Sequence, residues 1–176
     1  MPFVPRTARL LAGTLGGFAL VLGAGAPAVA GPSPWTPYQA SDFVAPAGER
    51  CSFELQGQVV SDKERIRTLE TFPDGSPRVQ QVVGQLLVRY TNTATGQSVV
   101  RNLTGNGIVE YSADGSYTLT LQGGHFAVGL QPTDPGGPGF LVFTGAGHRL
   151  DVAADGTRTI TYGSGPVEDL CGTLAG

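Results

Sequence analysis

Short stretches of alternating apolar and polar residues, separated by Asp-Gly pairs, constrain the fold of this chain more than any other feature. A two-residue period places every second side chain on the same face of a β-strand. Asp-Gly pairs occur at positions 74–75, 114–115 and 155–156, each between such stretches, and glycine accepts the positive φ of a tight hairpin turn. The pattern predicts an all-β domain of about eight to ten antiparallel strands with short connections.

The order of the strands follows from the shortness of these connections. Consecutive strands joined by tight turns are neighbours, so we expect an up-and-down meander that closes into an antiparallel barrel. A two-sheet β-sandwich is the alternative. Residues 61–70 are the one stretch where a turn of helix is expected between strands. The apolar sides of the strands are Phe53, Leu55 and Val59; Val82, Leu86, Val88 and Tyr90; Tyr117, Leu119 and Leu121; Phe140 to Phe143; and Ile160 with Tyr162.

Residues 1–30 have the composition of an export signal peptide. Arg6 and Arg9 give a positive start, an uncharged run follows, and Ala28-Val29-Ala30 is the small-residue pattern that signal peptidase cleaves. A transmembrane anchor is the alternative, but an apolar run of roughly 17 residues is marginal for spanning a bilayer. Cleavage after Ala30 would leave 146 of the 176 residues, enough for one domain. We therefore expect a secreted, extracellular protein without a membrane anchor.

The remaining chain divides into a proline-rich arm, residues 31–48, and a single β-barrel domain, residues 49–176. The arm holds Trp35, the only tryptophan, and four prolines: Pro32, Pro34, Pro37 and Pro46. Such a segment is expected to be extended, neither helical nor paired as a strand. It is either a mobile leader or a strap that lays Trp35 and Phe43 onto the barrel.

Two cysteines, Cys51 and Cys171, both lie in the domain. An even number of cysteines in an exported protein favours a disulfide, which here would close a loop of 120 residues. Two buried free thiols are the alternative. No metal site is expected, because two cysteines and two distant histidines lack the spacing of a ligand set.

The charge of the chain excludes one class of partner. Without Arg6 and Arg9 it keeps nine of its 11 basic residues against 14 acidic ones, a net charge of about −5. Nucleic acid requires clustered lysine and arginine, so no nucleic-acid partner is expected.

No catalytic residue or cofactor is predicted. His125 and His148 each follow glycine and read as polar residues at strand ends rather than as bases. Glu54, Glu110 and Asp151 lie within predicted strands. If two of these carboxylates faced each other inside a barrel, they could act as acid and base. The charged residues between Asp62 and Glu70 are interpreted as a solvated face.

Several motifs together resemble a family of small secreted β-proteins from actinobacteria, a family that has no known activity. The resemblance covers roughly residues 51–174 and implies membership without a mechanism. The strand count is also similar to lipocalin-like and avidin-like barrels, but the Gly-x-Trp start and the several pocket tryptophans are missing. The motifs are the arginine-biased signal, Cys51-Ser52-Phe53, Tyr90-Thr91-Asn92 with Thr95-Gly96, Gly136-Gly137-Pro138-Gly139, Phe143-Thr144-Gly145 and Asp169-Leu170-Cys171.

The function expected first is a secreted, non-enzymatic binding module that holds a small apolar or amphipathic ligand in the barrel. Plain core packing is the alternative role of the residues that would line it. The other functions considered are an extracellular or cell-envelope protein-interaction domain with a protein partner, and a barrel enzyme of the cyclase or isomerase type. The candidate lining residues are Leu86, Val88, Tyr90, Tyr117 and Leu119.

Overall fold

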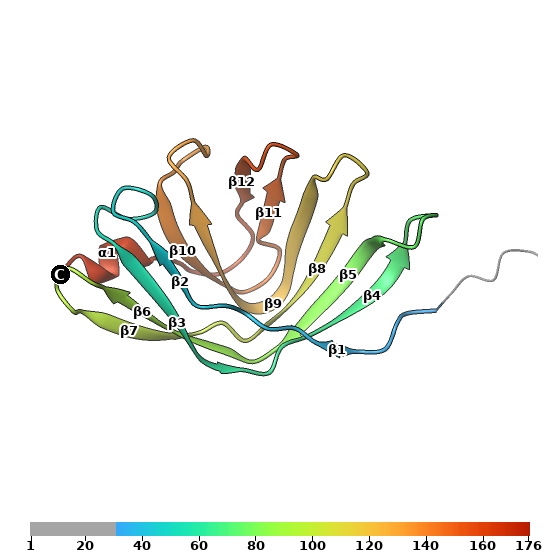
Figure 1. Ribbon diagram of the computed structural model, residues 1–176, viewed down its shortest axis with the longest axis horizontal. Helices are drawn as coiled ribbons and strands as arrows, with labels where there is room; N and C mark the ends of the chain where they lie inside the picture. The colour runs from blue at the N-terminus through green and yellow to red at the C-terminus, as the bar shows by residue number, and fades with distance from the viewer. Residues whose placement is uncertain (1–30) are drawn as a thin grey trace, which may run out of the picture.

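The computed structural model describes residues 31–176 of the chain. These residues contain thirteen β-strands and one short helix (Figure 1). The expected signal peptide lies outside the described residues. The prediction of an all-β protein is confirmed. The elements are β1 (Thr36–Pro37), β2 (Phe43–Ala45), β3 (Leu55–Asp62), β4 (Arg65–Thr71), β5 (Pro77–Gly84), β6 (Leu86–Asn92), β7 (Ser98–Asn102), β8 (Gly105–Tyr111), β9 (Tyr117–Leu130), β10 (Gly139–Thr144), β11 (Arg149–Val152), β12 (Arg158–Thr161), β13 (Val167–Asp169) and α1 (Leu170–Leu174).

Many of these strands are the two halves of a longer, bent strand. Only Lys63 and Glu64 separate β3 from β4, and only Gln85 separates β5 from β6. At each break the chain leaves one sheet and enters the other, while the long strands still pair in chain order as a meander. Residues 61–70, where a turn of helix was expected, instead end β3 and form most of β4.

The three Asp-Gly turns have the same construction. In the first, the Asp74 carboxylate accepts a hydrogen bond from the backbone N–H of Ser76 at 2.9 Å, and Gly75 has a φ of 87°. The turns at positions 114–115 and 155–156 repeat this bond at 2.9 Å, with glycine φ values of 88° and 87°. The aspartate side chain thus replaces a backbone acceptor, and the glycine supplies the left-handed conformation. These predicted turns are confirmed.

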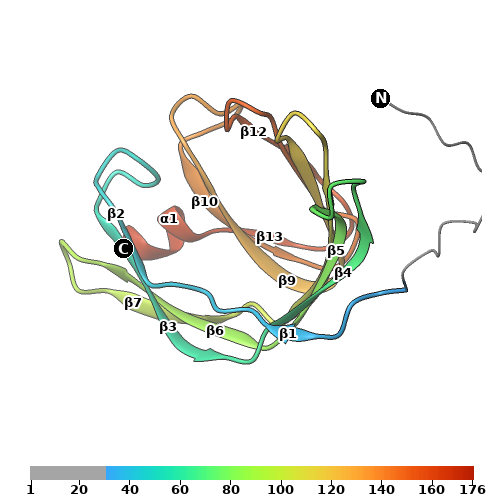
Figure 2. The same cartoon turned by 45° about the vertical axis from the view of Figure 1, so that its right-hand side comes forward.

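The strands form two antiparallel sheets. The larger has nine strands in the order β1-β4-β5-β8-β9-β10-β13, with β11 also paired to β9 and β12 paired to β11. The smaller has four strands in the order β2-β3-β6-β7. In Figure 2 the smaller sheet lies below β9, β10 and β13, and α1 lies between these two layers. No closed ring of paired strands occurs in residues 31–176, so the arrangement is closer to the sandwich alternative than to the expected barrel.

The sheets part where β7 continues into β8. β8 pairs with the first half of β9, and His125 N donates the last bond of this pairing to Thr104 O at 2.9 Å. Beyond this point the second half of β9 pairs with β10, and β7 diverges from it. Gly124 lies at the bend with a φ of 91°, and a Cβ there would collide with the Thr104 carbonyl oxygen. The bend at Gly124 therefore separates β7 from the second half of β9. A closed barrel would require these two segments to pair.

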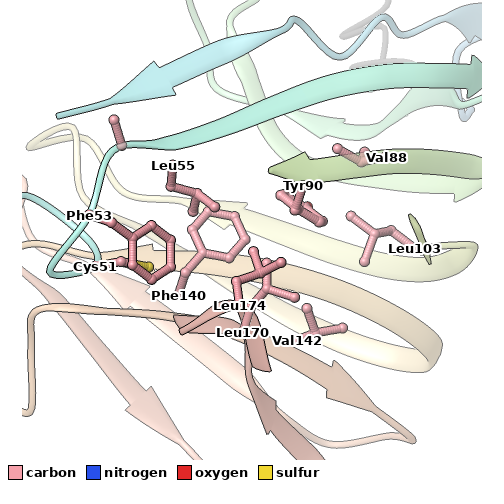
Figure 3. Close-up of a cluster of buried hydrophobic side chains, with 11 residues drawn as sticks. Cys51, Phe53, Leu55, Val88, Tyr90, Leu103, Phe140, Val142, Leu170 and Leu174 are labelled. Carbon is pink, nitrogen blue, oxygen red and sulfur yellow. The ribbon is translucent and has the colours of Figure 1, made fainter. Parts of the chain in front are cut away.

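Two apolar clusters form the core of residues 31–176. The first lies between the smaller sheet, β10 and α1, and includes the fully buried Leu55, Leu170 and Leu174 (Figure 3). The second lies where the two halves of β9 bend over each other. It contains Leu121 and the fully buried Phe143. Most residues of both clusters lie on strands, and Leu170 and Leu174 come from α1.

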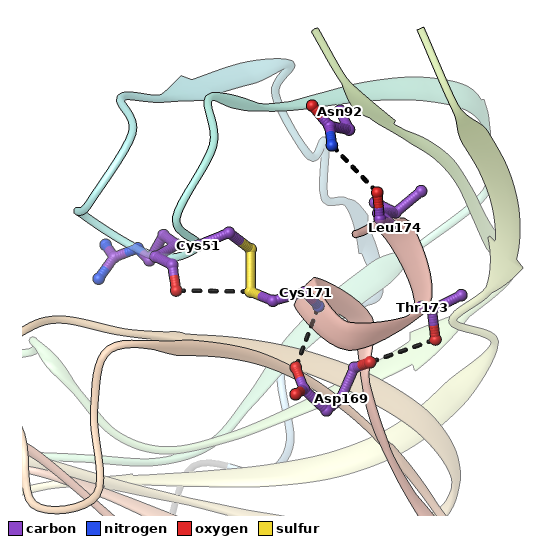
Figure 4. Close-up of a disulfide and its surroundings, with 7 residues drawn as sticks. Cys51, Asn92, Asp169, Cys171, Thr173 and Leu174 are labelled. Atoms are coloured by element: carbon purple, nitrogen blue, oxygen red, sulfur yellow. Dashed lines mark hydrogen bonds between the residues drawn. A yellow bond between two sulfur atoms is a disulfide. The ribbon is translucent and has the colours of Figure 1, made fainter. Parts of the chain in front are cut away.

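The predicted disulfide is confirmed. Cys51, before β3, is bonded to Cys171 in α1, and their Cα atoms are 5.3 Å apart (Figure 4). Asp169 caps the helix by accepting a hydrogen bond from Cys171 N at 3.0 Å. Asn92, at the end of β6, donates from Nδ2 to the carbonyl of Leu174 at 3.0 Å. The bridge and this hydrogen bond attach the C-terminal helix to the smaller sheet.

Parts of the proline-rich arm are paired as strands, so the prediction that the arm is not paired is wrong. β1 pairs with β4, and β2 pairs with β3, so the arm runs along the edges of both sheets. The Arg67 guanidinium lies 4.5 Å from the centre of the Trp35 ring. The Phe43 ring stacks on Phe140 with their centres 5.6 Å apart. Proline is tolerated because these are edge strands, whose outward N–H groups need no partner.

Candidate functional site

One face of the larger sheet is apolar along β8 and β9, and in one row the apolar surface continues across β5 and β4. Residues that are directly paired across strands project from the same face of a sheet. Their register forms three rows on this face. The rows are Ile66, Val82, Gly107 and Leu121; then Thr68, Gln80, Val109 and Leu119; then Tyr111 and Tyr117.

A cleft of about 520 Å³ lies over this face, and residues of all three rows line it. Leu86, Leu103 and Phe126 add further apolar atoms, and Tyr38 with Ala40 from the arm line it as well. The volume lies in the range of pockets that hold small molecules, roughly 300–1,000 Å³. An apolar ligand would be removed from water here against β-branched, leucine and aromatic side chains.

The five candidate lining residues are divided between the cleft and the core. Leu86, Tyr117 and Leu119 line the cleft. Val88 and Tyr90 do not line it: they are 5% and 2% exposed and belong to the first apolar cluster. The bend between β5 and β6 explains the difference, because it turns the continuation of the strand into the smaller sheet.

Glu64 brings a carboxyl group to the cleft from the break between β3 and β4. Burial, together with the smaller effect of the negative charge of Asp62, raises the pKa of Glu64 to about 7. The segment is fixed by two hydrogen bonds to Asp62, which accepts from Glu64 N at 2.8 Å and from Ala40 N at 2.7 Å. A carboxyl group with this pKa exchanges its proton near neutral pH.

Three tyrosines supply polar atoms around the apolar surface. Tyr111 and Tyr117 face each other across β8 and β9 with ring centres 5.9 Å apart. The Tyr111 hydroxyl donates to Gln80 Oε1 at 3.0 Å, and burial raises the pKa of Tyr111. Tyr38, from the arm, is 47% exposed. The cleft thus combines an apolar surface with a few hydroxyl groups, which suits an amphipathic ligand.

The two histidines differ in position. His125 lines the cleft, and its Nδ1 lies 2.9 Å from the Thr144 hydroxyl. His148 is fully buried; its Nδ1 accepts from Gly163 N at 3.1 Å, and its Nε2 lies 3.1 Å from Thr144 O. Backbone groups therefore occupy both nitrogens of His148, which gives it a structural role.

The carboxylates that the sequence placed inside strands do not line the cleft. Glu54 and Glu110 are exposed. Asp151 pairs with Arg149 and accepts from the Thr118 hydroxyl at 2.7 Å. Thr118 precedes Leu119, so it projects from the opposite face of β9. The facing pair of carboxylates that an acid–base mechanism would need is thus not formed by these three residues.

Sequence reasoning missed Glu64, Tyr111 and Ile66 as lining residues. Glu64 lies among the charged residues interpreted as a solvated face, and its sequence neighbours do not distinguish it. Ile66 was missed because residues 61–70 were expected to form a turn of helix rather than a strand. Tyr111 could have been found, since it follows Val109 at the two-residue period of the same strand.

These features define a two-sheet antiparallel β-protein with one disulfide and an apolar cleft on the inner face of the larger sheet. Comparison with family models, with curated proteins and with solved structures found no match for the chain. Within residues 31–176, no helix has the length and apolar character needed to cross a membrane. No group of three or more metal-ligating side chains occurs in the same residues.

Proposed function

We propose that this protein is a secreted, non-enzymatic binding module that holds a small apolar or amphipathic ligand. The observation that carries the proposal is the cleft of about 520 Å³ over the apolar side chains of β8 and β9 and the adjoining Ile66 of β4 and Val82 of β5. Burying apolar ligand surface there would contribute about 25 cal/mol per Å² before the entropic cost of association. A domain packed solid would have no such site.

Secretion is supported by two independent features. Residues 1–30 have the composition of a signal peptide, and Cys51 and Cys171 form a disulfide, which persists in oxidising compartments. We further propose membership of the actinobacterial family of secreted β-proteins that the sequence motifs resemble. The fold is proposed to be a sandwich-like variant of the up-and-down barrel, with the meander order kept and the ring open.

A barrel enzyme of the cyclase or isomerase type is the second candidate. Glu64 favours it, because a carboxyl group with a pKa of about 7 in an apolar cleft suits general acid–base catalysis. Binding is preferred because, among the described residues that line the cleft, Glu64 is the single one with a carboxyl group. An interaction domain has less support, since the exposed large apolar side chains come from five different segments of the chain: Tyr38, Val44, Val60, Val100 and Tyr162.

Native mass spectrometry of the protein from its own culture supernatant would test the proposal directly. A co-purifying ligand of constant mass, recovered unchanged, is the expected result. Conversion of that ligand during incubation would support the enzyme instead. A protein without ligand that also fails to bind the neutral apolar dye Nile red would overturn both candidates.

A matched pair of glycine substitutions locates the bound dye. Gly107 lines the cleft, and a Cβ there would lie 2.9 Å from Leu119 Cδ1, so Gly107→Leu fills the cleft. A Cβ on Gly123, in the next strand, would have no atom within 4 Å, which makes Gly123→Leu the control. We expect Gly107→Leu to weaken Nile red binding at least about tenfold and the control to retain it. Equal binding by both variants would place the dye elsewhere.

A further inference from the structure

A second, smaller hollow adjoins the apolar cleft. Its volume is about 370 Å³, and its charged lining residues are Arg50 and Glu49 from the loop before β3 and Arg158 at the start of β12, so the two arginines outnumber the one carboxylate. Leu119, Phe126 and Ala127 line both hollows, so the two lie side by side. A ligand larger than the cleft would extend toward the arginines.

Arg50 is held inside the molecule because a glycine makes room for it. A Cβ on Gly129, in the second half of β9, would lie 2.8 Å from Arg50 Nε and 3.0 Å from its Cδ. The Arg50 side chain therefore lies across the β9 backbone and is only 14% exposed. An arginine without a role in the interior would extend into water, where its charge is solvated.

Neither guanidinium is fully satisfied by the protein. The Nη1 atoms of Arg50 and Arg158 are both buried and have no hydrogen-bond partner among the described residues. The nearest carboxylates form loose ion pairs, with Glu49 Oε1 3.3 Å from Arg50 Nη2 and Asp134 Oδ2 3.7 Å from Arg158 Nη1. Buried charged donors without acceptors are costly and rare in native proteins.

The buried Asp134 does not supply the missing acceptor, because its Oδ2 lies 3.7 Å from Arg158 Nη1, beyond hydrogen-bond distance, and backbone groups already donate to both of its oxygens. Its Oδ1 accepts from Arg158 N at 2.8 Å, and its Oδ2 accepts from Gln131 N at 2.6 Å. Burial lowers the pKa of Arg50, and the positive charge of Arg158 lowers it further. The two cations are therefore close enough to repel each other, and an anion between them would relieve that repulsion.

We propose that this second hollow binds the carboxylate head group of the ligand while the apolar cleft holds its hydrocarbon part. The ligand class is thus an anionic amphiphile, such as a long-chain carboxylate. This inference rests on the proposed binding function. The planar guanidinium matches a carboxylate with two parallel N–H donors, which makes arginine the residue best suited to the task. Both arginines line the hollow, where a carboxylate would accept hydrogen bonds from their guanidinium N–H groups.

Three probes with the same hydrocarbon chain test the inference on the unmodified protein. Isothermal titration calorimetry would compare dodecanoate, dodecanol and dodecyltrimethylammonium at pH 8, below their micelle concentrations. We expect dodecanoate to bind at least about tenfold more tightly than the neutral alcohol, and the cation to bind most weakly. Equal affinities for dodecanoate and dodecanol would overturn the head-group site but leave the binding function intact. Absence of binding for all three would overturn both proposals.

Charge-removing variants assign the effect to the two arginines. Arg50→Gln and Arg158→Gln are expected to weaken dodecanoate binding about tenfold each and to leave dodecanol binding unchanged. Arg149→Gln is the matched control, because Arg149 is 51% exposed and pairs with Asp151 away from both hollows. Arg50→Lys keeps the positive charge but lacks the two parallel N–H donors of the guanidinium. It serves as a second variant if Arg50→Gln folds poorly. Weakening by the control equal to that of the two variants would contradict the assignment.

Discussion

The Arg101 guanidinium donates two hydrogen bonds to the Glu168 carboxylate, from Nη2 to Oε1 at 2.6 Å and from Nε to Oε2 at 2.7 Å. Arg101 lies on β7, an edge of the smaller sheet, and Glu168 lies on β13, an edge of the larger sheet. Thr173 in α1 also donates its hydroxyl to Glu168 Oε1 at 2.8 Å. A side-chain ion pair therefore joins two sheet edges that the backbone leaves unpaired.

Glu168→Gln should lower the free energy of unfolding by about 1–2 kcal/mol at pH 7. The hydrogen bond from Arg101 lowers the pKa of Glu168 below its ordinary value of 4.5. The stabilisation is therefore present above pH 4.5 and is lost as the pH falls through the lower pKa of the folded state. Urea denaturation at pH 7 and pH 3 would measure both effects. The exposed Glu110→Gln serves as control, and an equal loss in both variants would contradict the prediction.

The local features of the fold could be predicted because they depend on neighbours in the chain. Asp114 and Gly115 form the same turn wherever two alternating strands flank them, and the alternation of Tyr117, Leu119 and Leu121 orients each side chain. The disulfide was predictable because only one pairing of two cysteines exists. These features need no knowledge of the rest of the molecule.

The division into two sheets could not be predicted, because it depends on how distant strands meet. The bend at Gly124 is set by its close approach to Thr104, 20 positions earlier in the chain. Val88 and Tyr90 share an alternating pattern with Leu86, yet the break at Gln85 turns them into the core of the other layer. The pattern gives the period of a strand but not the sheet to which it belongs.

The burial of charged residues in the two hollows could not be predicted from the sequence either. Glu64 and Arg50 lie in polar surroundings of the sequence, where a solvated position is the ordinary expectation. Glu64 is held against the arm, where its carbonyl accepts a hydrogen bond from Tyr38 N at 3.0 Å, and Arg50 packs against Gly129 in β9. Only the assembled sheets bring these groups beside apolar surface.

Replacing both cysteines with alanine should destabilise the protein by about 2–5 kcal/mol. The bridge joins residues 120 positions apart, so its loss frees a long loop in the unfolded chain and detaches α1 from the loop before β3. Guanidinium denaturation of the native and double-alanine proteins would measure the difference. Intact mass before and after reduction supplies the control, since oxidised protein must be lighter by two hydrogen atoms. A reduced mass for the native protein would refute the bridge.

Glu64→Gln should stabilise the protein at pH 8 and have little effect at pH 4. The pKa of Glu64 is raised from 4.5 to about 7 in the folded state, so the folded protein binds the proton more tightly than the unfolded chain. The stability of the native protein therefore falls as the pH rises between these values, and the glutamine variant should lack that slope. Thermal unfolding across pH 4–8 would compare the two proteins, with Glu54→Gln as the exposed control. A parallel pH dependence in the native protein and Glu64→Gln would rule the prediction out.

Gly57→Ala should detach part of the arm from the smaller sheet. Gly57 lies opposite Phe43 in the β2–β3 pairing, and a Cβ at this position would collide with the Phe43 ring. The ring would have to leave its contact with Phe140, at a cost of about 1–3 kcal/mol.

A double-mutant cycle separates this effect from a general loss of strand stability. In a Phe43→Ala background the alanine at position 57 meets no ring, so the second substitution should cost almost nothing. Gly123→Ala is the control for adding a methyl group to a strand glycine, because no atom lies within 4 Å of its Cβ position. Urea denaturation of the four proteins in the cycle gives the coupling energy. Additive losses at the two positions would show that the ring and the glycine act independently, contrary to the contact seen here.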